Sequence, residues 1–487
     1  MNEHLQTLEP TIVWRHFKTL CETPRPSGGE EPLIGKLTAW AEARGLRCER
    51  DEARNLLVRK PASPGFEQAP GVVLQSHLDM VTQANADTPH DFTRDPIETW
   101  IDDDGWLRAR GTTLGADNGL GAAAALAILE DDTLTHGPLE ALFTVEEEAS
   151  LVGATHLAPD WLTGRYLLNL DSEERGQVYI GCAGGADVQV DTLLPTEALT
   201  SLEHSYRISV TGLVGGHSGL DIASGRGNAN RIMFRLLYLL DDLDVRLADY
   251  HGGTMRNAIT REAYATVVLS SASEGAFKAR VERLQRVLRE ELAGVDEGVT
   301  LSIAPATAQE ALALETSRKL VAAMVAAPYG IERMSVAVPG VVETSNNLGV
   351  IGLEEGRFHL GAMVRSLRDS ATLALCDRLV ALFSLLDIEA SVEGVYPGWV
   401  PAPQSPLLKR FIALHEKTVG TVPEVKVIHA GLECGIIGAK YPGLDMISFG
   451  PSILGAHSPT ERVEIDAVSE FYTMLKAMVE HLARDPA

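Results

Sequence analysis

Side chains that bind divalent metal ions recur in this sequence, and most of them follow an apolar run that is typical of a buried strand. They are His77, Asp79, Asp117, the Glu147-Glu148 pair, Asp171 and His457. Imidazole nitrogens and carboxylate oxygens are ligands of zinc and related cations. In open α/β sheets, ligands gather outside the carboxyl ends of the strands. A set of this kind, delivered repeatedly at strand ends, predicts a metal-dependent hydrolase.

Each of these positions also has a plain structural explanation when it is taken alone. Asp117 would serve as the N-cap of the Ala-rich segment 116–130, and the glutamates 146–148 would form a solvated acidic turn. Asp171 would start a turn, and a lone loop histidine such as His457 is usually just exposed. The metal-site hypothesis therefore depends on the joint occurrence of these residues, in this order and at strand ends.

The spacing within the motifs adds detail to the metal-site hypothesis. In S-H-L-D-M, His77 and Asp79 are two residues apart, so in a strand they point the same way and Asp79 can orient His77. Gly115 and Gly119 allow a tight backbone around Asp117, whose two oxygens can bridge two cations. In E-E-E, neighbouring carboxylates repel each other unless cations are present. Because adjacent side chains diverge, one can bind metal while its neighbour acts as general base.

The elements that must position these residues form an α/β pattern. Strand-like runs such as GVVLQSHLDMV, ALFTV, YLLNL and LDMISFG alternate with helical segments at 31–44 and 116–130. This alternation predicts a mainly parallel sheet with helices on both faces. From about residue 188, strands such as YRISVTGL alternate with long amphipathic helices. We therefore expect an α/β catalytic domain over 1–187 and 397–487, interrupted by an inserted α+β domain over 188–396.

Size and charge exclude several other classes of function. At 487 residues, the chain exceeds the usual size of one hydrophobic core. Its 67 acidic and 42 basic residues give a net charge of -25, which argues against a nucleic-acid partner. No apolar run reaches the length of about 18 residues that a membrane span needs, and the N-terminal stretch lacks the features of a secretory signal. The five cysteines are widely spaced and form no CxxC pair, which favours a reduced, cytoplasmic protein.

The motifs that carry these residues resemble those of the co-catalytic zinc peptidases, which include aminoacylases, carboxypeptidases of the G2 type and carnosinases. The matching pieces are H-L-D, G-A-D-N-G, E-E-E-A, L-D-S-E-E and G-P…H-S-P. Longer stretches, among them RGTTLGADNGLG, GGHSG, GGTMRNAI and VVETSNNLG, resemble the bacterial aminoacyl-histidine dipeptidases of this family. The resemblance covers essentially the whole chain. It implies a zinc-peptidase-like catalytic domain with an inserted lid or dimerisation domain.

The resemblance implies a role for each metal-site residue. The metal ligands would be His77 and Asp171 for one zinc ion, Glu148 and His457 for the other, and Asp117 as the bridge between both. Asp79 would orient His77, and Glu147 would be the general base that passes its proton to the leaving amine. Zinc is the implied metal, with cobalt or manganese as alternatives. The family pattern has two acids where this chain has three glutamates, and the Ala149 that follows selects Glu147 and Glu148.

For the inserted domain, the resemblance implies contacts with the substrate. His217, in V-T-G-L-V-G-G-H-S-G, would stabilise the tetrahedral oxyanion and can reach across a dimer interface; a β-turn with an incidental histidine is the alternative. Asn257 and Arg365 would hold the carboxylate end of the substrate, and the guanidinium fork suits a carboxylate well. Glu433, in HAGLECG, would line the catalytic side.

We therefore expect a dipeptidase that uses two divalent metal ions to cleave short peptides ending in histidine, β-Ala-His among them. A related N-acyl-amino-acid deacylase or a broad aminopeptidase shares the same metal set and is the second interpretation. A non-catalytic binding protein on the same fold is disfavoured, because every ligand and Glu147 are retained. A homodimer through the inserted domain is expected. The sequence leaves open the preferred N-terminal residue and the physiological metal.

Overall fold

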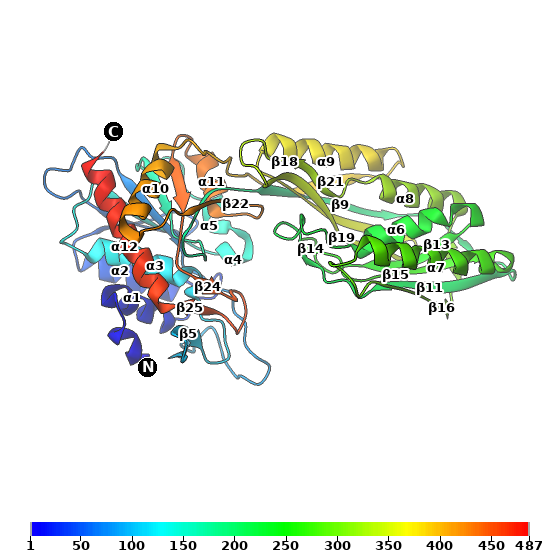
Figure 1. Ribbon diagram of the computed structural model, residues 1–487, viewed down its shortest axis with the longest axis horizontal. Helices are drawn as coiled ribbons and strands as arrows, with labels where there is room; N and C mark the ends of the chain where they lie inside the picture. Colours follow the sequence, from blue (N-terminus) through cyan, green and yellow to red (C-terminus); the bar gives the residue numbers. More distant parts are fainter. Residues whose placement is uncertain (1, 486–487) are drawn as a thin grey trace. The chain divides into compact units, whose positions relative to one another are not determined.

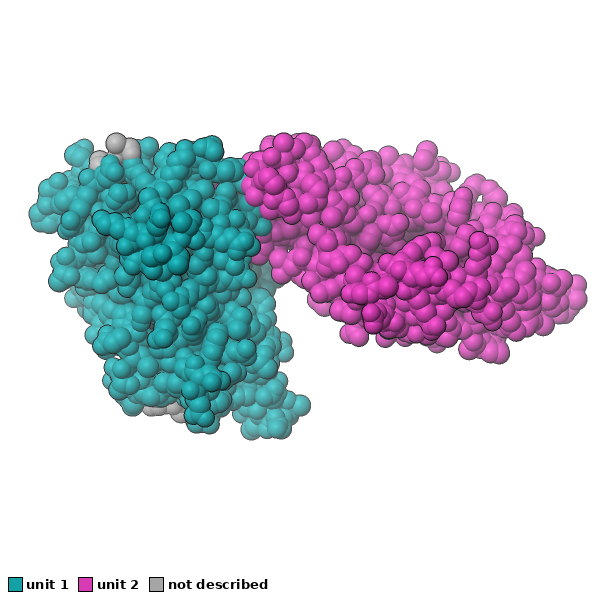
Figure 2. Space-filling view, viewed as in Figure 1, with its two compact units in different colours: residues 1–181, 401–427, 432–487 teal, residues 182–400, 428–431 magenta. Residues whose placement is uncertain are grey.

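The computed structural model describes residues 2–485, which fall into two compact units, coloured separately in Figure 2. Unit 1 comprises residues 1–181, 401–427 and 432–487, and unit 2 comprises residues 182–400 and 428–431. The predicted junctions lie after residues 187 and 396, and no local sequence pattern indicates that 428–431 belongs with unit 2. This segment belongs there because the backbone N–H of Ala183 donates to the carbonyl oxygens of Ile428 and Ala430, each at 3.0 Å.

Unit 1 is built on an eight-stranded sheet in the order β1-β2-β6-β3-β7-β23-β8-β22. Its strands are β1 (Arg47–Arg50), β2 (Leu56–Lys60), β3 (Val72–His77), β6 (Leu139–Thr144), β7 (Tyr166–Asn169), β8 (Gln177–Cys182), β22 (Glu424–Ile428) and β23 (Asp445–Ser448). The four neighbours β6, β3, β7 and β23 run parallel. The pairs β1–β2, β2–β6 and β8–β23 are antiparallel. The predicted parallel sheet is therefore confirmed at its centre, whereas its outer strands are antiparallel.

The helices of unit 1 are η1 (Glu3–Thr7), α1 (Thr11–Cys21), α2 (Glu31–Glu42), α3 (Ala116–Glu130), α4 (Glu147–Ser150), α5 (Val152–Thr155), α10 (Pro406–Val419), α11 (Glu433–Lys440) and α12 (Ile465–Arg484) (Figure 1). Buried side chains of η1, α1, α2, α3, α10 and α12 share one hydrophobic core with the sheet. Nearly every side chain of α3 is buried, from Asn118 through Leu129. A helix that is apolar on all sides has to lie inside the molecule, and the alanines and glycines of α3 let its neighbours pack closely.

A second, smaller sheet of unit 1 has the strand order β24-β25-β5-β4. Its strands are β4 (Thr99–Ile101), β5 (Trp106–Ala109), β24 (Ile453–Leu454) and β25 (Arg462–Glu464). The short β24 and β25 are antiparallel, with Ile453 opposite Val463, and β25 also pairs with β5. The loop between β24 and β25 contains His457, so this small sheet fixes both ends of the loop.

Unit 2 contains a large sheet in the order β16-β11-β15-β13-β19-β20-β9-β21, with β18 also paired to β19. The strands are β9 (Gly184–Leu193), β11 (Glu203–Thr211), β13 (Arg246–Gly252), β15 (Ala263–Ser270), β16 (Thr300–Ala306), β18 (Gly330–Met334), β19 (Val342–Glu354), β20 (Arg357–Ser366) and β21 (Ala390–Tyr396). Neighbouring strands of this sheet are antiparallel, for example β11 with β15 and β19 with β20. An antiparallel sheet with helices is the α+β arrangement that the sequence predicts.

The helices of unit 2 cover one face of its large sheet. They are α6 (Ala229–Leu239), α7 (Glu274–Glu291), α8 (Leu314–Ala326) and α9 (Asp369–Ser384). Alternate residues of β11, namely Tyr206, Ile208 and Val210, are buried with these helices, while Arg207 between them is exposed. This period of two is what a sheet with one covered face requires. Short elements complete the unit: β10 (Thr196–Ala198), β12 (Gly216–His217), β14 (Ala258–Ile259), β17 (Glu310–Leu312), η2 (Asp241–Leu243) and η3 (Ser271–Ser273).

Over residues 2–485, none of the helices combines the length and the apolar composition that a membrane crossing requires.

Candidate metal centre

The candidate metal ligands lie where three parallel strands of unit 1 end. His77 is the last residue of β3, Asp171 follows β7 by two residues, and Glu148 lies in α4, just after β6. Because β6, β3 and β7 are parallel neighbours, their carboxyl ends meet at one edge of the sheet. Asp117 joins them from the first turn of α3, and His457 from the loop between β24 and β25. The fold thus gathers five residues that span 381 positions of sequence, from 77 to 457 counted inclusively.

Asp117 stands between two groups of ligands. One of its carboxylate oxygens lies 3.2 Å from His77 Nε2, and the other lies 3.1 Å from His457 Nε2. His77 Nε2 is also 3.4 Å from Asp171, and His457 Nε2 is 3.1 Å from Glu148. The ligand atoms of each group of three lie within 4.8 Å of one another. A carboxylate shared by two such groups is the arrangement that two bridged cations need.

The chemistry of these residues fits two divalent cations. The two histidines and three carboxylates offer the nitrogen and oxygen donors that zinc prefers. Glu148 Oε1 is buried and has no hydrogen-bond partner among the described residues, so this oxygen has capacity for a further ligand. Several carboxylates in one buried site repel each other unless positive charge is present, and a cation supplies that charge. The donor set therefore fits a pair of metal ions that share Asp117.

The carboxylates control the charge of the two histidines. Hydrogen bonds with Asp117 and Glu148 raise the pKa of His457 to about 11. Burial opposes a charge on His77, but Asp171 and Asp117 outweigh it and raise the pKa of His77 well above its ordinary value. Both rings are therefore protonated near neutral pH when no metal is bound. A metal ion has to displace these protons, because only a neutral imidazole can act as its ligand.

Asp79 lies two residues beyond the end of β3 and is completely buried. Its Oδ1 is 3.4 Å from His77 Nδ1 and accepts a hydrogen bond from the backbone N–H of Glu147 at 3.0 Å. Its Oδ2 accepts from the N–H of Glu148 at 3.1 Å and from the Ser27 hydroxyl at 2.7 Å. Asp79 therefore contacts the ring of one candidate ligand and the backbone of another. The sequence motif suggested the first of these contacts but not the second.

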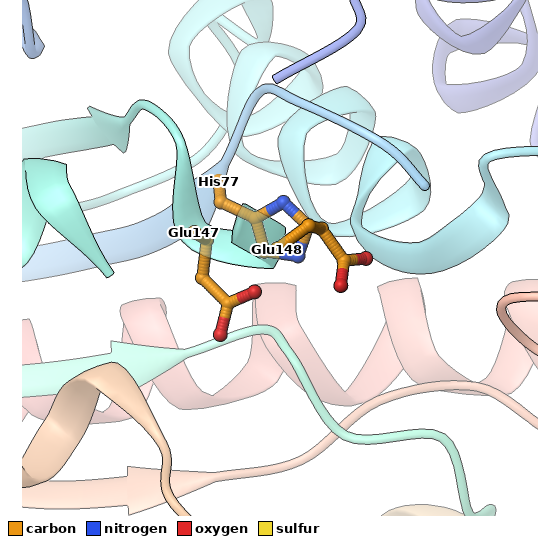
Figure 3. Close-up of side chains that lie close together, drawn as sticks. All are labelled: His77, Glu147 and Glu148. Atoms are coloured by element: carbon orange, nitrogen blue, oxygen red, sulfur yellow. The ribbon is translucent and has the colours of Figure 1, made fainter. Parts of the chain in front are cut away.

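The three consecutive glutamates have different surroundings. Glu146 has a left-handed backbone, with φ 51°, and its carboxylate accepts from Arg54 Nη2 at 2.5 Å. Glu147 and Glu148 instead form a group with His77 whose ligand atoms lie within 4.8 Å, and their carboxylates point in different directions (Figure 3). Burial, together with the nearby carboxylates, raises the pKa of Glu147 well above its ordinary value. A raised pKa suits a group that must take up and then release a proton near neutral pH.

Glu433 begins α11 and is completely buried beside the site. Its Oε2 accepts from Gln75 Nε2 at 2.6 Å and from the Thr144 hydroxyl at 2.7 Å, and Gln75 in turn accepts from the side chain of Asn169. Burial raises the pKa of Glu433 to about 7. The sequence analysis missed Gln75, Thr144 and Asn169. Each is a polar residue near the end of an otherwise apolar strand, and that signal could have identified them.

The three candidate substrate residues of the inserted segment lie in unit 2. His217 Nδ1 accepts from the backbone N–H groups of Gly219 and Leu220, each at 3.1 Å, which places the ring proton on Nε2. Burial and the nearby Arg365 lower the pKa of His217 to about 4, so the ring is neutral at neutral pH. Arg365 is buried in β20, lies 3.5 Å from His217 Nε2 and donates to the Tyr396 hydroxyl at 3.0 Å. His217 thus presents a neutral N–H donor next to a fixed cation.

Asn257 belongs to a loop that other motifs of unit 2 hold in place. Its carbonyl oxygen accepts from the backbone N–H of Ser218 at 2.8 Å, which links it to the residue after His217. Asn347, in TSNNLG, donates from its side chain to the carbonyls of Arg256 and Ala258 on either side of Asn257, at 2.9 and 2.8 Å. These long-range contacts connect the loop of Asn257 to the TSNNLG segment.

His429 joins this group and was not singled out by the sequence analysis. It lies in the segment 428–431 and contacts the Ser345 hydroxyl through Nε2 at 2.8 Å. Burial, followed by the charge of Arg365, lowers the pKa of His429 to about 3. The sequence signal that could have identified His429 is a histidine in a loop that also contains glycines, H-A-G-L-E-C-G.

Several known proteins resemble this chain in sequence or in fold. The sequence profile described as peptidase family M20/M25/M40 matches residues 73–481. A cytosol non-specific dipeptidase of Escherichia coli is 42% identical over 480 residues, which cover 98% of this chain and 99% of that protein. The crystal structure of an aminoacylhistidine dipeptidase from Vibrio alginolyticus is 42% identical, covers 98% of this chain and 97% of its own, and superposes with a TM-score of 0.91. The aminopeptidase PepT of Bacillus cereus shares the fold at 17% identity, with a TM-score of 0.56.

Proposed function

The chain belongs to peptidase family M20/M25/M40, and on that basis we propose that it is a dipeptidase that cleaves Xaa-His dipeptides, β-Ala-His among them, with two zinc ions. One observation carries this proposal: Asp117 lies between two groups of metal ligands, with Glu147 beside them. The two relatives with 42% identity are both named as dipeptidases, and one of them as an aminoacylhistidine dipeptidase. The names support a dipeptide substrate, and the ligand geometry supports a metal-dependent reaction.

Five residues would hold the metal ions. They are His77 and Asp171 for one ion, Glu148 and His457 for the other, and Asp117 for both. When bound, the two ions would lower the pKa of a water molecule and polarise the carbonyl group of the substrate. Zinc fits the mixed nitrogen and oxygen donors best, and cobalt or manganese can bind to the same donors.

The residues of unit 1 around these ligands would move the proton. We assign Glu147 as the general base, which accepts a proton from the attacking water at its carboxylate and then delivers it to the nitrogen of the leaving amine. Asp79 would hold the His77 ring in place through Nδ1 and fix the backbone that carries Glu147. Glu433 would line the substrate side, where its Oε1 has no hydrogen-bond partner among residues 2–485.

The residues of unit 2 would bind the substrate. We assign the Nε2–H of His217 as a hydrogen-bond donor to the carbonyl oxygen as negative charge develops on it. Arg365 and Asn257 would bind the carboxylate end of the dipeptide. A guanidinium that is already held by Tyr396 loses little freedom when it binds, which favours affinity.

A dipeptidase without preference for histidine is the second candidate. The name of the Escherichia coli relative favours it, since that protein is described as non-specific and aligns over 98% of this chain. The two candidates share the metal site and the general base, and they differ only in how the C-terminal side chain of the substrate is bound. A deacylase differs further, because its substrate lacks the free amino group of a dipeptide.

Hydrolysis of matched substrates tests the proposal. The zinc-loaded protein and its Glu147→Gln variant would be assayed on Ala-His, β-Ala-His, Ala-Leu and N-acetyl-histidine, with zinc counted in each preparation. Glu146→Gln is the matched control, because the Glu146 carboxylate is bound to Arg54. We expect cleavage of the histidine dipeptides by wild type and by the control, and loss of activity in Glu147→Gln with two zinc ions retained.

Each other result has a distinct meaning. Equal rates on Ala-His and Ala-Leu would select the non-specific dipeptidase. Cleavage of N-acetyl-histidine alone would select the deacylase. Loss of zinc in Glu147→Gln would mean that this glutamate is a ligand and that the base has been assigned to the wrong residue. No cleavage of any of these substrates by the zinc-loaded wild type would reject the proposed function.

The proposal includes a cytoplasmic homodimer formed through unit 2. Next to His217, the side chains of Val214 and Leu220 are 56% and 60% exposed, and exposed apolar groups beside a functional loop are typical of a contact surface. The name of the Escherichia coli relative places that protein in the cytosol. Light scattering of the purified protein tests the dimer, and a Val214→Asp, Leu220→Asp double variant should dissociate it. A wild-type protein that scatters as a monomer would remove the homodimer from the proposal.

A further inference from the structure

The segment that carries Asp117 is not helical, although it opens α3. Asp117 has φ -79° and ψ 116°, Asn118 has φ -101° and ψ 32°, and Gly115 has a left-handed backbone with φ 68°. The N–H groups at the start of a helix have no partner within that helix. Here they are also buried, since neither Leu114 nor Ala116 is exposed at all. Something outside the helix therefore has to accept their hydrogen bonds.

The carboxylate of Glu461 accepts four consecutive N–H groups of this segment. Its Oε2 accepts from Leu114 at 2.7 Å and from Gly115 at 2.9 Å, and its Oε1 accepts from Ala116 at 2.8 Å and from Asp117 at 3.3 Å. Glu461 is only 2% exposed. Four donors directed at one carboxylate use both of its oxygens, which a neutral side chain of the same shape cannot reproduce.

Glu461 also connects two of the three ligands of one metal group, Asp117 and His457. It lies four residues after His457, immediately before β25, and its own N–H donates to the carbonyl of Ser458 at 3.0 Å. Because β25 pairs with β5, the backbone that carries Glu461 has a fixed support. One carboxylate thus sets the position of Asp117 relative to the loop that carries His457.

Arg25 holds the carbonyl side of the same segment. Its guanidinium is 1% exposed and donates to the carbonyl oxygens of Leu78 and Asp79, at 2.8 and 2.9 Å, and to that of Gly115 at 2.5 Å. The first two of these carbonyls directly follow His77. Arg25 therefore fixes the Asp117 segment relative to the end of β3, where the other metal group begins.

Two glycines of G-A-D-N-G make room for this guanidinium. A Cβ atom on Gly115 would lie 2.5 Å from Arg25 Nη2, and one on Gly119 would lie 2.7 Å from the same nitrogen. Real Cβ atoms do not approach so closely, and Arg25 is too confined to move away. The position of the Arg25 guanidinium therefore requires glycine at both positions that flank Asp117.

The same segment reaches a further ligand through Asn118. The side-chain amide of Asn118 donates to the carbonyl of Leu170 at 2.8 Å and also to the carboxylate of Asp171. A shift of the segment would therefore move Asp171 together with Asp117. Both metal groups depend on where this short stretch of backbone lies.

We propose that Glu461 and Arg25 are positioning residues that hold the Asp117 segment from its N–H side and from its carbonyl side, so that Asp117 is placed between both metal groups before any metal binds. Neither residue contacts substrate or metal in this assignment. The inference rests on the proposed metal site, and it goes further by naming the groups that preorganise it. Supporting residues of this kind commonly change metal affinity by about 10- to 100-fold.

Cobalt titration of the metal-free protein tests the inference. The variants are Glu461→Gln, which keeps the size but removes the charge, and Arg25→Lys, which keeps the charge but removes the planar fork. Glu464→Gln is the matched control, since this carboxylate lies in β25 three residues further on and pairs with Arg175 on the surface. Visible absorption would report Co²⁺ affinity and geometry, far-UV circular dichroism would report folding, and kcat and KM would be measured on Ala-His.

For the two variants, we expect Co²⁺ affinity to fall by about 10- to 100-fold, with an altered absorption spectrum. We also expect a reduced kcat and a KM within about threefold of wild type, because the substrate contacts are untouched. Glu464→Gln should bind Co²⁺ like wild type. A folded Glu461→Gln protein with wild-type Co²⁺ affinity and spectrum would overturn the inference and leave Glu461 with a purely structural role.

Two further outcomes are also decisive. If Glu461→Gln does not fold, the Co²⁺ affinity of Arg25→Lys tests the inference instead. A weakened Co²⁺ affinity would support the inference, and an unchanged affinity would overturn it. If the wild-type protein itself binds no Co²⁺, the proposed function fails, and the inference fails with it. The wild-type titration therefore separates a failure of the metal site from a failure of the positioning residues alone.

Discussion

In unit 1, His77 and His457 lie among carboxylates, whereas in unit 2, His217 and His429 lie near the guanidinium of Arg365. The carboxylates raise the pKa of His457 to about 11, while burial and Arg365 lower the pKa of His217 to about 4 and that of His429 to about 3. The same side chain is therefore a protonated partner of anions in one unit and a neutral group in the other.

The difference shows how the surroundings of a histidine select its chemistry. A ring among carboxylates lies in a site of negative potential, where a metal ion can replace its proton and use the ring nitrogen as a ligand. A neutral ring whose Nδ1 accepts two backbone N–H groups can only donate from Nε2, which suits an oxyanion.

Removal of the shared carboxylate should have the largest effect. In Asp117→Asn, one of the two bridging oxygens becomes an NH2 group, which cannot bind a cation, and the other becomes a neutral amide oxygen, so the two cations lose their shared carboxylate. We expect kcat/KM on Ala-His to fall by about 1,000-fold or more, together with the bound zinc. Asp132→Asn, which alters a side chain that is 93% exposed, is the control and should behave as wild type. Two zinc ions retained in Asp117→Asn would contradict the bridging role.

Removal of the neutral histidine of unit 2 should have the next largest effect. His217→Ala should reduce kcat by about 100- to 1,000-fold, which is the cost of one oxyanion donor, and should leave the zinc content unchanged. The exposed His251→Ala in the same unit is the control. A loss of zinc in His217→Ala would show that His217 supports metal binding, which contradicts the assignment of metal binding to unit 1 and substrate binding to unit 2.

The pH dependence of metal binding follows from the raised pKa values in unit 1. In the metal-free protein, His457 carries a proton between pH 6 and 8, because its pKa is about 11, and the pKa of His77 is also raised well above its ordinary value. Zinc binding has to release those protons, so zinc affinity should rise with pH by about tenfold per unit for each proton released. Calorimetry in buffers of different ionisation enthalpy would count the protons.

The same pH range should leave His217 uncharged. Its pKa of about 4 lies below pH 6, so activity of the zinc-saturated enzyme should not fall between pH 8 and 6 through protonation of this ring. His217→Gln should also release as many protons on zinc binding as wild type. Zinc binding without proton release would contradict the electrostatic picture of unit 1.

The smallest effect on the contrast between the histidines should come from the loss of the Arg365 charge. Burial is the first cause of the low pKa of His217 and Arg365 the second, so Arg365→Met should raise that pKa only part of the way from about 4 toward 6.5. The pKa of His457 should not change, because its partners are Asp117 and Glu148. Proton NMR of the histidine rings would follow both, with His217→Gln to assign the signal. An unchanged pKa of His217 would show that Arg365 does not contribute to the low pKa of this ring.

Local sequence patterns predicted many elements of the fold closely. The run 116–130 forms α3 with those bounds, and most of YRISVTGL lies in β11, which ends at Thr211. These predictions succeed because the burial of an apolar face has the period of the element itself. The junctions between the two units were harder to predict from the sequence. The segment 428–431 belongs to unit 2 through hydrogen bonds to Ala183, which no local pattern encodes.

The same distinction between local patterns and long-range contacts applies to the candidate site. The candidate side chains could be identified from local patterns, because a histidine or carboxylate after an apolar run stands out without knowledge of its neighbours. The role of each side chain depends on contacts that form only in the folded protein. Glu146 is bound by Arg54, 92 residues away, and the Asp117 segment is held by Glu461, more than 340 residues away. A hydrogen bond depends on distance and direction in space, and packing of the whole unit sets both, so the spacing of residues along the chain cannot reveal it.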